Sequence, residues 1–117
     1  MVFSNSLFLI LGLTGLVFIT GGYLFFKFPP KKINHLYGYR TKTSMNSQEK
    51  WDFSQRYSSK EMIKQGIYMV LIGIIGSIIN PSENISIPLA IGVLIFCCVM
   101  LFIKTERELK NNFKTNS

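Results

Sequence analysis

Charge is absent from three long stretches of this sequence, and chemically reactive residues are scarce throughout. The 117 residues include one histidine, two cysteines and only six acidic residues. His35 lies far along the chain from Cys97 and Cys98, so the sequence shows no clustered ligand set of the kind that binds a metal. It also has no Ser-His-Asp order, glycine-rich phosphate loop or His-Glu-x-x-His motif. We therefore predict no catalytic residue, no metal and no cofactor, and we do not expect an enzyme.

The uncharged stretches are long enough to cross a membrane as helices. They cover residues 7–26, 65–82 and 84–103. A helix of about twenty residues rises ~30 Å, which is about the thickness of the hydrocarbon core of a bilayer. The second stretch is slightly short unless Lys64 extends its amine to the headgroups. The sequence therefore predicts three transmembrane helices, at about residues 7–28, 62–80 and 86–104.

Three spans leave little chain for a separate soluble domain. We expect an all-α membrane protein in which residues 1–117 form a single membrane domain, a small bundle of three helices. Residues 29–61 would be the loop between the first two spans, and residues 105–117 a C-terminal tail. Glycines at 12 and 15 and at 66, 73 and 76 would permit close helix approach. Whether they face another helix of the chain or a second copy in a homo-oligomer stays open.

The distribution of positive charge predicts the orientation in the membrane. Residues 27–64 contain nine lysines or arginines and three acidic residues, whereas the connection between the second and third stretches contains only Glu83. Basic loops stay on the cytoplasmic side, so we expect the long loop and the basic C-terminal tail in the cytoplasm and the N-terminus outside. We attribute the net charge of +7 to this topology and to anionic lipid headgroups, and we predict no nucleic-acid partner.

Within the long loop, residues 29–61, the sequence predicts where helices end and begin. Two successive prolines at 29 and 30 should end the first helix, because proline lacks a backbone donor and disfavours helix in the residue before it. Asn46 followed by Glu49 predicts the start of a short interfacial helix over residues 47–57. A second pair, Ser58 and Glu61, predicts another start near residue 59 that continues into the membrane.

Several side chains in this loop suggest specific contacts. Trp51 and Tyr57 could anchor the short helix at the headgroup level, where amphipathic rings are favoured. Arg40 follows Gly38, which permits a tight turn, and its guanidinium group suits carboxylate, phosphate or carbonyl partners. Arg40 is the leading candidate for a binding residue. The same pattern is also typical of an arginine that sets topology or contacts lipid.

The loop sequence resembles a signature of the SdpI family of bacterial membrane proteins. The resemblance extends over nearly the whole chain and rests on Lys32-Ile33-Asn34, Tyr37-Gly38-Tyr39-Arg40-Thr41, Ser44-Met45-Asn46 and Glu49 with Trp51. The motif residues that it implies for this chain are Asn34, Gly38, Arg40, Thr41, Ser44, Asn46, Glu49 and Trp51.

The resemblance implies a bacterial plasma-membrane protein with the activity known in that family. One member is an immunity protein that protects the producing cell from its own secreted toxin and also signals by drawing a repressor to the membrane. Our first hypothesis is therefore resistance to a membrane-active peptide toxin. The alternative is a signalling or scaffold protein whose basic loop recruits a soluble regulator or anionic lipid. Arg40 and Asn34 could instead hold the loop against helix ends for a structural reason.

Overall fold

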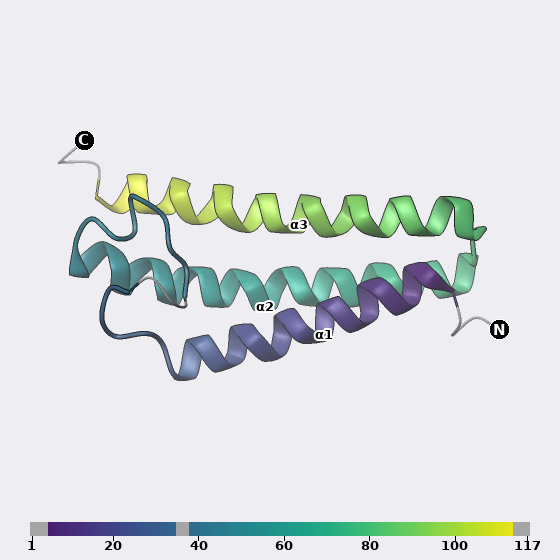
Figure 1. Cartoon of the computed structure of the whole chain (residues 1–117), viewed down its shortest axis with the longest axis horizontal. Helices are drawn as coiled ribbons and strands as arrows, with labels where there is room; N and C mark the ends of the chain where they lie inside the picture. Colours follow the sequence, from purple (N-terminus) through teal and green to yellow (C-terminus); the bar gives the residue numbers. More distant parts are fainter. Residues whose placement is uncertain (1–4, 35–37, 114–117) are drawn as a thin grey trace.

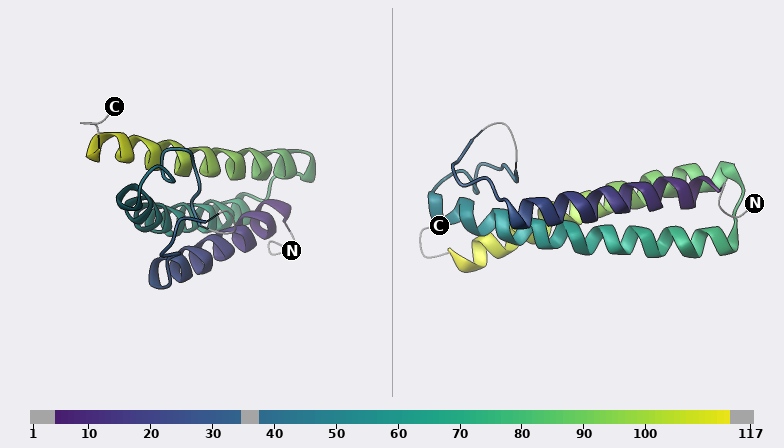
Figure 2. Two further views of the ribbon diagram at one scale, coloured as in Figure 1. Left: turned by 60° about the vertical axis from the view of Figure 1, so that its left-hand side comes forward. Right: turned by 90° about the horizontal axis from the view of Figure 1, so that it is seen from below.

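The protein is a bundle of three long helices. The computed structural model describes residues 5–34 and 38–113, and within these ranges it contains three helices and no strand. α1 spans Ser6–Lys27, α2 spans Gln48–Ile79 and α3 spans Glu83–Asn112. Successive helices run in opposite directions along the 52 Å axis of the molecule (Figures 1 and 2). The predicted all-α fold with three spanning helices is confirmed.

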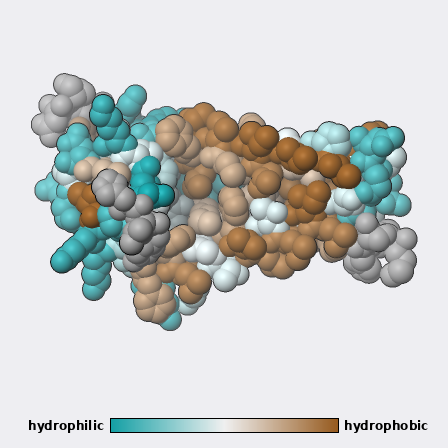
Figure 3. All heavy atoms as spheres, in the orientation of Figure 1, coloured by the Kyte–Doolittle hydropathy of each residue, from teal (hydrophilic) through white to brown (hydrophobic). Residues whose placement is uncertain are grey.

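The surface of the bundle matches a bilayer. All three helices are long and apolar enough to cross a membrane. Large apolar side chains such as Leu13, Ile78 and Phe96 are more than half exposed. Figure 3 shows a broad hydrophobic band along the middle of the molecule between two hydrophilic ends. Exposed apolar surface on this scale is stable only against lipid or protein, so the chain is a multi-pass membrane protein.

The separate interfacial helix predicted over residues 47–57 is not confirmed. Residues 48–57 form the first turns of α2, which continues without a break to Ile79. The N-cap is Ser47, whose hydroxyl accepts from the backbone N–H of Lys50 at 3.1 Å, and not Asn46. The hydroxyls of Ser58 and Ser59 donate to carbonyls three residues back in the same helix, so they do not cap a new one.

Glycines allow α1 and α2 to pack closely. A Cβ atom built on Gly66 would lie 2.7 Å from the carbonyl oxygen of Gly15, and a Cβ on Gly15 would lie 2.7 Å from that of Gly66. Gly22 similarly faces the backbone of α2, and Gly73 faces that of α1. Small residues permit this approach because the backbones meet without intervening side chains. In the described structure these glycines therefore face a helix of the same chain.

Asn5 joins the helices at the end of the bundle that contains the α2–α3 connection. Its side chain is buried, and its amide nitrogen lies 3.0 Å from Asn80 Oδ1 and 3.1 Å from the carbonyl oxygen of Pro81. Its Oδ1 accepts from the N–H of Leu7 and so caps α1. The long loop lies at the opposite end, where α1 ends, α2 begins and α3 ends (Figure 1). The candidate site is at that loop end.

Candidate functional site

Trp51 attaches the loop to the first turns of α2. Its side chain is completely buried, and its indole N–H donates to the carbonyl oxygen of Pro30 at 2.6 Å. The predicted role of Trp51 as a headgroup anchor is therefore wrong, because the ring does not reach the surface. A buried indole needs an acceptor for its N–H, and the carbonyl after the end of α1 supplies one.

Gln55, one turn further along α2, binds both the backbone N–H and the backbone carbonyl of Tyr39. Its amide nitrogen donates to the Tyr39 carbonyl at 2.6 Å, and its Oε1 accepts from the Tyr39 N–H at 2.7 Å. The side chain of Gln55 is 3% exposed. The preceding residue, Gly38, has φ +98°, and a Cβ atom there would lie 2.6 Å from Gln55 Oε1. Only glycine fits this position without strain.

Thr41 and Ser44 form a small polar turn next to the contact between Gln55 and Tyr39. The Thr41 N–H donates to Ser44 Oγ at 2.8 Å, and the Ser44 N–H donates to Thr41 Oγ1 at 3.1 Å. Ser44 is fully buried, and its hydroxyl lies 3.0 Å from the Thr41 carbonyl oxygen. These reciprocal bonds satisfy polar groups that are otherwise cut off from water. The two signature residues therefore fix the shape of the loop.

Glu106 of α3 binds the same turn from the other side. Its Oε2 accepts from the Tyr39 hydroxyl at 2.7 Å and from the Thr41 hydroxyl at 2.8 Å. Burial, together with the neighbouring Glu106 carboxylate, raises the pKa of Tyr39 well above its usual value. Tyr39 therefore stays protonated and keeps its role as a donor at physiological pH. Through these bonds the loop joins α2 to α3.

The remaining predicted site residues have different surroundings. Asn34 is partly buried, and its amide donates to the Lys32 carbonyl at 2.9 Å, which is a loop carbonyl and not a helix end. Arg40 and Asn46 are exposed, and Glu49 is exposed in the first turn of α2. The structure thus brings together Gly38, Thr41, Ser44 and Trp51 and leaves the side chains of Arg40, Asn46 and Glu49 at the surface.

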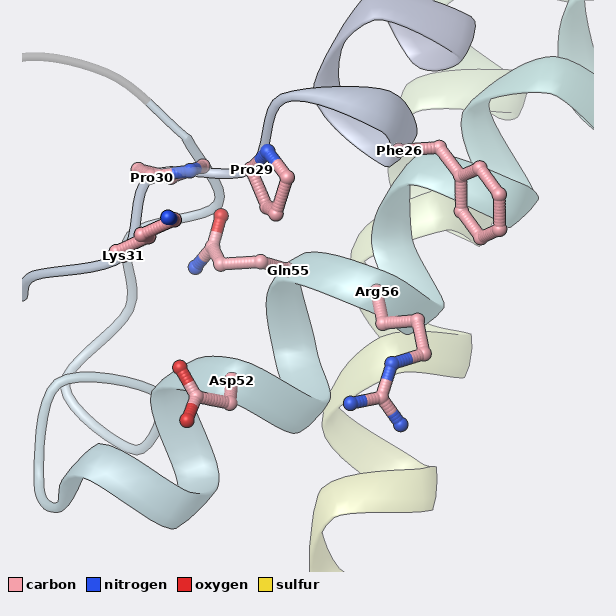
Figure 4. A pocket seen from close by; sticks show the side chains of 7 residues that line it. All are labelled: Phe26, Pro29, Pro30, Lys31, Asp52, Gln55 and Arg56. Atoms are coloured by element: carbon pink, nitrogen blue, oxygen red, sulfur yellow. The ribbon is translucent and has the colours of Figure 1, made fainter.

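Trp51, Gln55 and Glu106, with the loop residues that they hold, form a structure that we call the cap. A pocket opens beside the cap. It has a volume of about 310 Å³ and lies between the end of α1, the loop and the first turns of α2 (Figure 4). Its lining residues are Phe26, Pro29, Pro30, Lys31, Asp52, Gln55 and Arg56. α2 contributes the polar residues Asp52, Gln55 and Arg56, whereas α1 contributes the apolar Phe26.

Charged groups also meet between α2 and α3 below the loop. Glu61 is 3% exposed, and its carboxylate lies 3.1 Å from Lys64 Nζ and 3.9 Å from Lys104 Nζ. The carboxylate is thus compensated by two amines, which is the usual condition for a buried charge. Among residues 5–34 and 38–113, no group of three histidine, cysteine or acidic side chains is arranged to hold a metal ion. His35, the single histidine of the sequence, lies outside the described residues.

Comparison with known proteins identifies relatives of this chain. Residues 31–111 match the model of the SdpI/YfhL protein family. The chain is 42% identical over 102 residues to the uncharacterized protein YfhL of Bacillus subtilis (strain 168), an alignment that covers 84% of this chain and 87% of YfhL. No solved structure matches the chain significantly. The matched region begins at Lys31, so it contains every loop residue of the candidate site except the prolines.

Proposed function

The chain belongs to the SdpI/YfhL protein family, and we propose that it protects its cell against a membrane-active peptide toxin. In this proposal residues 1–117 form one domain in a bacterial plasma membrane, with the N-terminus outside and the loop in the cytoplasm. The observation that carries it is the cap at the loop end: Trp51, Gln55 and Glu106 hold the loop, and Arg40 is exposed on it.

A loop held in this way suits recognition better than a flexible one. Tyr39 and Thr41, which flank Arg40, are both bonded to buried or partly buried groups, so the backbone that carries the guanidinium group is fixed. Arginine binds carboxylates through two parallel hydrogen bonds, and less entropy is lost when its position is already set. Arg40 would contact an acidic group of a toxin, or a carboxylate on a protein that the toxin uses.

Replacing Arg40 by alanine is expected to abolish protection while leaving the protein in the membrane. The measurement is survival of a sensitive bacterial strain that expresses the chain and is challenged with a panel of membrane-active peptides. The wild-type chain should raise the lethal concentration of at least one peptide by about tenfold, a difference of about 1.4 kcal/mol in the relevant equilibrium. Arg40→Ala should return it to the level of cells without the protein.

The matched control is Lys42→Ala, which removes an exposed positive charge two residues away. It should retain protection, and Arg40→Lys should show an intermediate effect because lysine keeps the charge but loses the planar fork. Membrane fractions and thermal unfolding of each variant establish equal expression and folding. Unchanged killing by every peptide at confirmed expression of the wild-type chain would reject toxin protection.

The alternative function is recruitment of a soluble regulator or anionic lipid by the basic loop. Lys31, Lys32 and Lys42 are all exposed, which favours an acidic partner at this end of the bundle. Trp51 does not contribute because it is buried. Reversal of charge in Lys32→Glu with Lys42→Glu should remove a salt-sensitive partner from pull-downs of the solubilised protein. A partner that binds equally to both forms, or no partner at all, would reject recruitment by charge.

A further inference from the structure

The pocket beside the cap combines apolar and charged residues that the proposed toxin protection does not use, and it shares only Lys31 with the alternative function. Figure 4 shows Phe26 at the end of α1, Lys31 on the loop, and Asp52 and Arg56 on successive turns of α2. The pocket volume of about 310 Å³ lies at the small end of the range for sites that bind small molecules. It is therefore large enough for a headgroup or a small metabolite.

The position of the pocket along α1 places it at the membrane boundary. The uncharged part of α1 ends at Phe26, and Lys27 follows as its last residue. The Phe26 ring is 45% exposed, and Lys60 Nζ lies 5.5 Å from its centroid. Aromatic rings with an amine above them are typical of the headgroup region, where the ring contacts hydrocarbon and the amine contacts phosphate. In a bilayer, the Phe26 side of the pocket would therefore face lipid chains, and its charged residues would lie at headgroup depth.

The charges of the pocket favour a ligand with one negative charge. Within the part of the chain that the structure describes, neither Lys31 nor Arg56 forms an ion pair. Asp52 Oδ1 accepts from Gln48 Nε2 at 2.8 Å, and its other oxygen can accept a further hydrogen bond. Two cations and one carboxylate leave a net charge of +1. A phosphodiester carries a charge of −1 and would neutralise the pocket.

We propose that this pocket binds the headgroup of phosphatidylglycerol. Arg56 and Lys31 would bind the phosphate oxygens, Asp52 would accept from a headgroup hydroxyl, and an acyl chain would leave past Phe26. A zwitterionic headgroup would leave the net positive charge uncompensated, and a dianionic phosphate monoester would approach Asp52 without a hydroxyl to offer it. The inference is independent of toxin protection, since it involves neither Arg40 nor a peptide.

The test is lipid retention by the full chain, measured by native mass spectrometry after purification in detergent and addition of lipids with identical acyl chains. Phosphatidylglycerol should be retained about tenfold more strongly than phosphatidylethanolamine, as expected for one charge-assisted contact. The double variant Lys31→Gln with Arg56→Gln should lose this preference and retain the two lipids equally. The matched control, Arg107→Gln with Lys110→Gln, removes the same charge from exposed positions of α3 outside the pocket and should keep the preference.

Two further arms identify the source of the phosphate and the role of Asp52. Glycerophosphoglycerol, the soluble headgroup, should displace the lipid only weakly, because it lacks the chain that would contact Phe26. Asp52→Asn, which retains an acceptor for Gln48, should weaken the retention of phosphatidylglycerol and strengthen the retention of phosphatidic acid. The proposal is overturned by equal retention of the two phospholipids, by displacement with inorganic phosphate at the same concentration as lipid, or by equal losses in the pocket and control variants. Thermal unfolding confirms that all variants are folded.

Discussion

Replacing Gln55 by leucine is expected to lower the free energy of unfolding by about 2 to 4 kcal/mol. Leucine has a similar size but leaves the Tyr39 N–H and carbonyl without the two partners that Gln55 provides at 2.7 and 2.6 Å. The Tyr39 carbonyl keeps the Ser44 hydroxyl as a donor at 3.3 Å, so the full cost of an unpaired group, about 1 to 3 kcal/mol, applies to the N–H alone. The lost bond to the carbonyl adds about 1 kcal/mol. Unfolding in detergent, followed by circular dichroism, measures the loss.

Limited trypsin digestion provides a second, local readout for the same variant. Release of Tyr39 should expose the peptide bonds after Arg40 and Lys42 and speed cleavage there more than elsewhere. The matched control is Gln48→Leu, because Gln48 is exposed and its bonds to Lys31 and Asp52 can be replaced by water. Its effect should stay below about 1 kcal/mol. Equal effects of the two substitutions would show that Gln55 does not hold the loop.

The helices could be predicted from the sequence because their signals are local. Runs of about twenty uncharged residues have few alternatives to a transmembrane helix, and the prolines at 29 and 30 end α1 as expected, with Phe28 as its C-cap. The boundary of α2 was harder. Ser58 followed by Glu61 resembles a capping box, yet each serine hydroxyl near it bonds its own helix and Glu61 turns toward lysines of α2 and α3. A continuous helix satisfies these groups without a new start.

The site could be predicted only in part, because most of its bonds link distant residues. Gly38, Thr41, Ser44 and Trp51 belong to the loop signature and do lie together. No local motif points to Gln55 or Glu106, since the partners of Gln55 are 16 residues away and those of Glu106 are 65 to 67 residues away. The sequence predicts Trp51 at the headgroups, because its burial depends on how the loop returns over α2. Sequence separation hid these contacts.

Gln55 connects the two features at the loop end of the bundle. Its amide clamps Tyr39, and the same residue lines the pocket that also contains Lys31 and Arg56. Pro30 also belongs to both features, since it lines the pocket and its carbonyl accepts from the Trp51 indole N–H. A ligand in the pocket would therefore contact the residues that fix the Arg40-bearing loop. Lipid bound there would stabilise the cap by mass action, since it binds only the folded arrangement.

The second large effect is expected from substitutions at the α1–α2 contact. Gly66→Ala should destabilise the bundle by about 1 to 3 kcal/mol, and Gly66→Val by more. A Cβ atom on Gly66 would lie 2.7 Å from the Gly15 carbonyl oxygen and 2.9 Å from the Ile19 backbone nitrogen, so the helices must separate to admit it. Separation also removes the neighbouring contacts of Gly22 and Gly73. The free energy of unfolding of each variant is measured in mixed micelles and compared with that of the wild-type protein in the same lipid.

Gly92→Ala is the matched control for this contact. Gly92 lies in α3, and a Cβ atom there would have no neighbour within 4 Å. Alanine favours helix over glycine by about 1 kcal/mol in water, so this variant should be neutral or slightly more stable. The same preference acts at Gly66 and makes a loss there a lower bound on the cost of the clash. If the two alanine variants unfold alike, the backbones of α1 and α2 are not in contact at Gly15 and Gly66, and the described packing of the bundle is wrong.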